Sequence, residues 1–163
     1  MKGVELLLRN LHDGETRMAG ELTAVAGHHA GEPEVRHVAK DLATWSRAHV
    51  RRLADAAGER RLALEGPPDP SAAAFLRAPA ATASRADRET GHPGLLLLGD
   101  LRALHLAASE NSLHWVMLAQ AAQATRDPRL LQLTTECHPQ TLRQINWTDT
   151  MVKTLSPQIL TGL

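Results

Sequence analysis

The feature of this 163-residue sequence that most constrains its fold is an internal repeat at a spacing of 95 residues. When residues 11–41 are aligned with residues 106–136, Glu15 coincides with Glu110, and Glu32-Pro33 coincides with Asp127-Pro128. The apolar positions coincide as well: Leu11 with Leu106, Met18 with Leu113, and Leu22 with Met117. Self-similarity at a fixed spacing predicts one supersecondary unit that occurs twice in the chain.

Each copy of the repeat has the pattern of a helical hairpin. Apolar residues recur at steps of three and four, which is the period of an α-helix with one apolar face. Pro33 and Pro128 suit the first position of a helix, because the missing N–H is not needed there. We expect helices at about 3–30, 33–58, 94–125 and 128–155, with His28 and His29 closing the first of them.

Residues 59–93 between the two hairpins are rich in proline and form a long predicted crossover. Short helical pieces are expected within it, for instance around 71–76. A connection of this length can run along a whole helix and make the second and third helices parallel. The predicted fold is therefore all-α, a single domain over 1–163 built as a four-helix bundle. Pro139 is expected to kink the last helix, which should end before Pro157.

Charge and cysteine content exclude several functions. Eighteen Lys and Arg balance eighteen Asp and Glu, so there is no excess positive charge for nucleic acid. No apolar run has the length of a membrane span. Cys137 is the only cysteine, which excludes an intramolecular disulfide and favours the cytoplasm. Spare apolar faces on such helices favour a homodimer.

Polar side chains interrupt the apolar seams at one level. Glu15 precedes Glu32 by 17 residues and His49 follows it by 17, so the two should face each other about 25 Å from the turn. Glu110 and Gln144 stand in the same relation to Asp127 in the second copy. Buried polar groups of this kind need one another, water or a cation.

With these residues the chain resembles the ferritin-like superfamily, which includes bacterioferritin and rubrerythrin. In that family each hairpin supplies one Glu and one Glu-x-x-His to a di-iron or di-manganese pair. Glu15 and Glu110 match the single glutamates, whereas Ser46-x-x-His49 and Thr141-x-x-Gln144 replace the second motif. The resemblance implies the bundle fold with a degenerate ligand set.

Three functional hypotheses follow, and the physiological role is open among them. In the first, Glu15, His49 and Glu110 bind one divalent metal, either zinc, iron or manganese, with Gln144 orienting them. His114 and His138 are the alternate ligands if the third helix is rotated.

The other two hypotheses involve no divalent metal ion bound by Glu15, His49 and Glu110. In the second hypothesis, the polar side chains pair only with one another, and the chain is a non-enzymatic scaffolding or partner-binding module. Alternatively, the core holds haem or a small molecule, with Met18 and Met117 beside His49. No catalytic motif points to an enzyme.

Overall fold

The computed structural model describes residues 2–65 and 82–163, and the regular structure in these residues is helical. This confirms the all-α prediction. Most ends of the four long helices lie within two residues of the predicted positions. The helices are α1 (Lys2–His28), α2 (Pro33–Glu59), α3 (Arg85–Thr90), α4 (Pro93–Ala124) and α5 (Pro128–Thr161).

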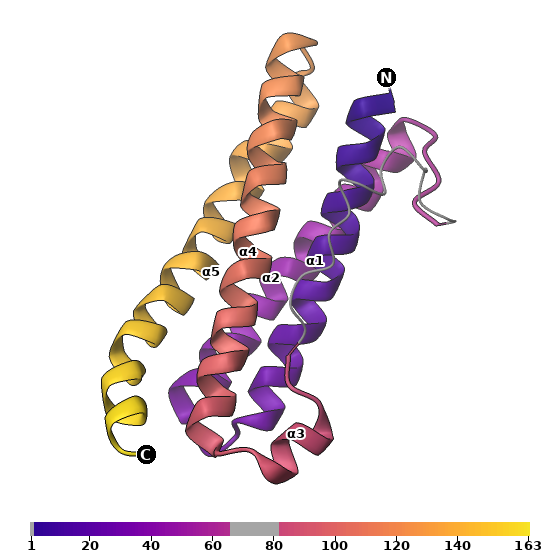
Figure 1. Ribbon diagram of the computed structural model, residues 1–163. Helices are drawn as coiled ribbons and strands as arrows, with labels where there is room; N and C mark the ends of the chain where they lie inside the picture. The colour runs from indigo at the N-terminus through magenta and orange to yellow at the C-terminus, as the bar shows by residue number, and fades with distance from the viewer. Residues whose placement is uncertain (1, 66–81) are drawn as a thin grey trace.

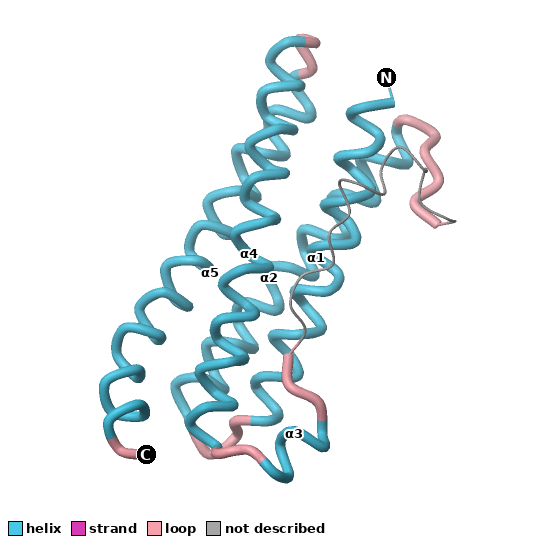
Figure 2. Tube along the Cα trace, viewed as in Figure 1, coloured by secondary structure: helices cyan, strands magenta, loops and turns pink. Residues whose placement is uncertain are grey.

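The long helices form two antiparallel pairs, α1 with α2 and α4 with α5 (Figure 1). The pairs pack together mainly through α1 and α4, and to a smaller extent through α2 and α5. Helices α2 and α4 run in the same direction, and α3 lies at the end where α4 begins (Figure 2). Among the helices that the structure describes, none has an apolar stretch of the length needed to cross a bilayer.

Helix starts are defined by local sequence. Prolines occupy the first turns of α2, α4 and α5, and the Asp127 side chain accepts a 3.0 Å hydrogen bond from the Leu130 N–H. Ser84 and Asp87 form a capping box that begins α3, a short helix of the kind expected within the crossover, at a position that the sequence did not specify. The helical piece expected around 71–76 lies outside the described residues.

The predicted end of the last helix is wrong. Helix α5 passes through both Pro139 and Pro157 and ends at Thr161, instead of ending before Pro157. A proline removes one backbone donor but does not by itself end a helix. Residues on both sides of Pro139 stay helical because they pack along α4 and α2.

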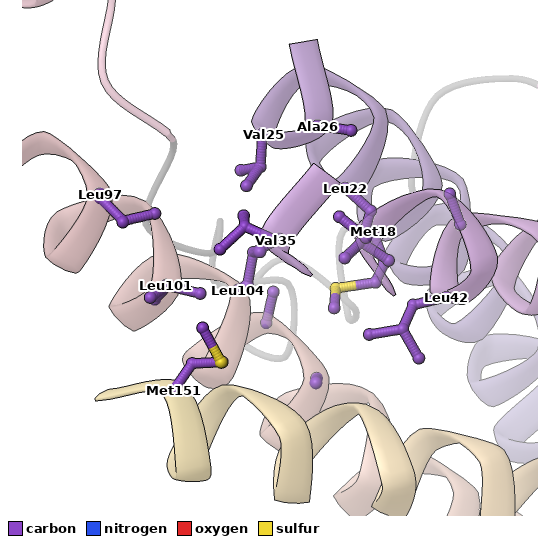
Figure 3. Close-up of a cluster of buried hydrophobic side chains, with 14 residues drawn as sticks. Met18, Leu22, Val25, Ala26, Val35, Leu42, Leu97, Leu101, Leu104 and Met151 are labelled. Carbon is purple, nitrogen blue, oxygen red and sulfur yellow. The ribbon is translucent and has the colours of Figure 1, made fainter. Parts of the chain in front are cut away.

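Two hydrophobic clusters fill the interior. The first draws on all four long helices, with Leu22, Leu42, Leu104 and Met151 among its members (Figure 3). The second contains Leu8, Leu11, Leu53, Leu118 and Leu130. Between them along every long helix lie buried polar side chains, which we call the polar layer: Glu15, Ser46, His49, Asn111, Thr141 and Gln144.

Helix α4 is rotated relative to the prediction. Its buried face carries Leu104, Ala108, Asn111, Trp115 and Leu118. The residues expected to face inward, Leu106, Leu113 and Met117, are instead 44%, 60% and 39% exposed. The predicted inner face of this helix is therefore wrong by one residue.

The turns explain this shift. Residues 29–32 separate α1 from α2, but only residues 125–127 separate α4 from α5. At the end of α4, Arg126 adopts a left-handed φ of 54°, and the Asp127 N–H bonds the Ala122 carbonyl. This is a Schellman ending that leads directly into the cap of α5. One residue fewer in the turn places residue 111, and not 110, opposite Glu15.

Candidate functional site

Glu15 is the centre of the polar layer. Its side chain is fully buried, and its Oε1 atom accepts hydrogen bonds from Trp115 Nε1 at 3.1 Å and from Thr141 Oγ1 at 3.4 Å. His49 Nδ1 lies 3.1 Å from the same oxygen. Helices α2, α4 and α5 thus all hold one oxygen of a carboxylate that α1 supplies.

His49 is held from both sides. Its Nε2 atom lies 2.8 Å from Gln140 Oε1, an acceptor, so Nε2 carries a proton. Its Nδ1 atom makes no hydrogen bond of good geometry with any described residue, so its 3.1 Å contact with Glu15 is electrostatic. The Trp115 ring meets the imidazole edge-on at 5.8 Å. The predicted facing of Glu15 and His49 is confirmed.

A second set of hydrogen bonds joins α2 to α5 in the same layer. Gln144 Nε2 donates to Ser46 Oγ at 2.9 Å and to the Leu42 carbonyl at 3.2 Å. Two buried acceptors, Glu15 Oε2 and Gln144 Oε1, receive no hydrogen bond within the described part of the chain. The layer is therefore well connected but retains unused lone pairs.

Glu110 does not occupy the inward position that the repeat predicts. It is half-buried, and its neighbour Asn111 is the residue that points into the layer. Consecutive helical residues leave the axis about 100° apart, so Glu110 projects to the side. Helices α1 and α4 approach each other closely at Asn111, because a Cβ atom on Gly14 would lie 2.2 Å from Asn111 Oδ1.

The two alternate histidine ligands have other positions. His114 is buried on α4, and burial lowers its pKa. His138 Nε2 lies 2.8 Å from Ser112 Oγ across the α4–α5 contact, and burial lowers its pKa too. Both histidines are therefore neutral at neutral pH. Over residues 2–65 and 82–163, no three His, Cys, Asp or Glu side chains are grouped so that they could hold a metal ion.

The residues present do not fit the dinuclear centre that the ferritin-like resemblance implies. Such a centre needs several bridging carboxylates, and in this layer Glu15 is the only acidic residue among the buried side chains. Ser46 and Thr141 occupy the places of bridging glutamates, and both hydroxyls serve as hydrogen-bond partners. No two-metal chemistry is supported by this set.

Haem would need axial ligands in the core. Met18 is fully buried, but Met117 is 39% exposed on the outer side of α4. A His49–Met117 axial pair is therefore not available, whereas the broader hypothesis of a small-molecule pocket stays a prediction.

A second buried polar cluster, which the sequence did not predict, lies at the end of the bundle where α4 begins. Asp100 is fully buried and is bonded by His29 at 2.8 Å, by the Arg88 guanidinium and by the Ala83 N–H at 3.0 Å. Burial opposes ionisation of Asp100, but these donors outweigh it and hold the pKa of the carboxyl below its usual value. The cluster fastens residues 83–88 and the α1–α2 turn to α4.

Comparison of the chain with protein-family models, with curated proteins and with solved structures found no match.

Proposed function

We propose that this protein is a ferritin-like four-helix bundle that acts without catalysis, as a self-associating helical scaffold. Two antiparallel helix pairs, joined by a crossover and packed through α1 with α4 and α2 with α5, support the bundle topology. The single cysteine supports a reducing compartment such as the cytoplasm.

The polar layer acts in this proposal as a structural element. His49 Nδ1 lies 3.1 Å from Glu15 Oε1, so a protonated imidazole and this carboxylate would form a buried ion pair with no net charge. Hydrogen bonds from Trp115 and Thr141 fix the position of the Glu15 carboxylate, and the hydrogen bond to Gln140 fixes that of the His49 ring. Charge balance and fixed partners are the conditions under which a buried ion pair is tolerated.

The observation that carries the scaffold proposal is the second apolar face of α4. Leu106, Leu113 and Met117 are exposed on the side of α4 away from the buried Trp115 and Leu118. A surface helix of a monomer usually has one apolar stripe, and a contiguous exposed apolar patch marks an interaction site.

Sedimentation velocity across a range of protein concentrations tests this proposal. A scaffold that associates with itself shifts from the monomer to a larger species as the concentration rises. A single monomeric species at every concentration would overturn the proposal.

A second candidate function is the binding of one divalent cation in the polar layer. It is favoured by three buried atoms with lone pairs and no hydrogen-bond donor in the described residues: Glu15 Oε2, His49 Nδ1 and Gln144 Oε1. Carboxylate, imidazole and amide oxygen together suit manganese, iron or zinc. Such an ion would have one carboxylate to balance two charges in a fully buried site, which is why the metal-free reading is preferred.

Titration calorimetry with Mn²⁺, Fe²⁺ under anaerobic conditions, and Zn²⁺ separates the two candidates. Stoichiometric binding that disappears in Glu15→Gln, and persists in a variant of the exposed His37, would establish the cation site. Absence of binding by the wild-type chain ends this candidate and leaves the scaffold proposal intact.

A further inference from the structure

Helix α4 carries a continuous surface stripe that is distinct from its buried face. The large apolar side chains Leu95, Leu106, Leu113 and Met117 are 42%, 44%, 60% and 39% exposed. Together with Gly99, Arg102 and Glu110 they follow one another at steps of four and three, and we call these seven positions the outer stripe. Such spacing is typical of one helix packed along another.

The outer stripe has an internal symmetry about Leu106. Positions at equal distances on either side of Leu106 are both apolar or are complementary in size or charge. Leu95 and Met117 lie 11 positions away, Gly99 and Leu113 lie seven away, and Arg102 and Glu110 lie four away. An antiparallel copy of the same helix, related by a two-fold axis at Leu106, would bring each of these pairs together.

The steric part of the fit rests on Gly99. A Cβ atom built on Gly99 meets no heavy atom within 4 Å, so the helix surface is open at this point. Leu113 is the most exposed of the four large apolar side chains of the stripe, at 60%. Leu113 of one copy therefore packs over Gly99 of the other, and this contact occurs twice.

The charged residues of the outer stripe determine the direction of the second α4 helix relative to the first. In the antiparallel arrangement Arg102 lies opposite Glu110 of the second copy, and two such oppositely charged pairs flank the central Leu106 contact. A parallel arrangement would place Arg102 beside Arg102, Glu110 beside Glu110, and glycine beside glycine. Like charges at close range are unfavourable, so complementarity selects the antiparallel arrangement.

We propose that a second copy of this chain covers the outer stripe, with the two α4 helices antiparallel and the two-fold axis at Leu106. This inference rests on the proposed scaffold function and specifies its partner and its register. From Leu95 to Met117 the contact runs about 33 Å at 1.5 Å per residue, which is about two thirds of the length of α4.

Charge exchange tests the register. Arg102→Glu and Glu110→Arg should each weaken dimerisation at least tenfold, because each places like charges in contact, and the double variant Arg102→Glu/Glu110→Arg should restore it. Leu113→Asp should abolish the dimer. Leu142→Asp is the matched control, because Leu142 is an exposed leucine (43%) on α5 outside the stripe. Circular dichroism and thermal unfolding confirm that each variant is folded.

Spin-label distances measure the geometry directly, in a Cys137→Ala background. Labels at Arg102 should lie about 12 Å apart along the axis and labels at Gln120 about 42 Å apart, from 1.5 Å per residue. Equal short distances at both positions would indicate parallel helices and overturn the inference. A dimer that survives Leu113→Asp but not Leu142→Asp would overturn this surface and leave the scaffold proposal standing. A chain that is monomeric throughout would overturn both.

Discussion

Replacement of His49 by leucine should destabilise the protein by about 3–5 kcal/mol, because it leaves the buried Glu15 carboxyl group without the imidazole that lies 3.1 Å from it. Glu15 is fully buried, and its hydrogen bonds from Trp115 and Thr141 supply no compensating charge. The loss of the Gln140 contact of His49 adds to the effect. Urea unfolding followed by circular dichroism at neutral pH gives the free energy of unfolding.

The double variant Glu15→Met/His49→Leu makes this prediction specific. It removes the charge together with the imidazole and leaves mainly the Trp115 N–H without an acceptor, which costs about 1–3 kcal/mol. The double variant should therefore be more stable than His49→Leu alone. His37→Leu, an exposed change on the same helix, should stay within about 0.5 kcal/mol of the wild type.

Two results would refute the reasoning about the polar layer. One is a His49→Leu variant that loses less than about 1 kcal/mol, the net value of an ordinary hydrogen bond. The other is a double variant whose loss of unfolding free energy equals the sum of the losses in Glu15→Met and His49→Leu measured separately. The effects of independent sites add, whereas those of two interacting side chains do not.

Three further predictions concern the packing and the ionisable groups. Gly14→Ala should destabilise the protein by about 1–3 kcal/mol, because its Cβ would overlap Asn111 Oδ1 at 2.2 Å, whereas Gly20→Ala, with open space around it, should stabilise by about 0.4–1 kcal/mol; thermal unfolding compares the two. The Asp100 carboxyl has a lowered pKa in the folded chain, so it stabilises the fold above its unfolded pKa and loses that contribution as the pH falls below about 4. Urea titrations at neutral and acidic pH should show that Asp100→Asn is less stable at neutral pH and has a weaker acid dependence; an unchanged acid dependence would contradict the assignment. Burial raises the pKa of the Cys137 thiol to about 11, so iodoacetamide should modify it at neutral pH only after unfolding, and rapid modification of the native protein would contradict its burial.

The sequence predicted the helices because their limits depend on local chemistry. Pro33 and Pro128 define the starts of α2 and α5, and the repeat spacing of 95 residues holds for the buried faces of these two helices. Ser46 and His49 correspond to Thr141 and Gln144, and all four are buried as expected.

The orientation of α4 could not be obtained in this way, because its leucines lie on two faces. The 95-residue alignment matched the buried face of α1 with the outer stripe of α4, since both have the same apolar period. The turn at 125–127 is one residue shorter than the turn at 29–32, and this difference was the signal for the orientation of α4. One residue fewer moves the inward position of this helix from Glu110 to Asn111.

The candidate site was predicted in part for the same reason. Equal distances from the first turn correctly paired Glu15 with His49. Trp115 and Gln140 were missed as partners of this pair, because their positions depend on the rotation of α4 and on contacts between the hairpins. The Asp100 cluster joins segments distant in sequence, and no periodic pattern reports such a contact.

The mass of the protein in solution tests the central claim most directly. Sedimentation equilibrium of the wild-type chain should give twice the 17.7 kDa of one copy at high concentration, and Leu113→Asp should give 17.7 kDa under the same conditions. A wild-type chain that sediments at 17.7 kDa at every concentration would contradict the account.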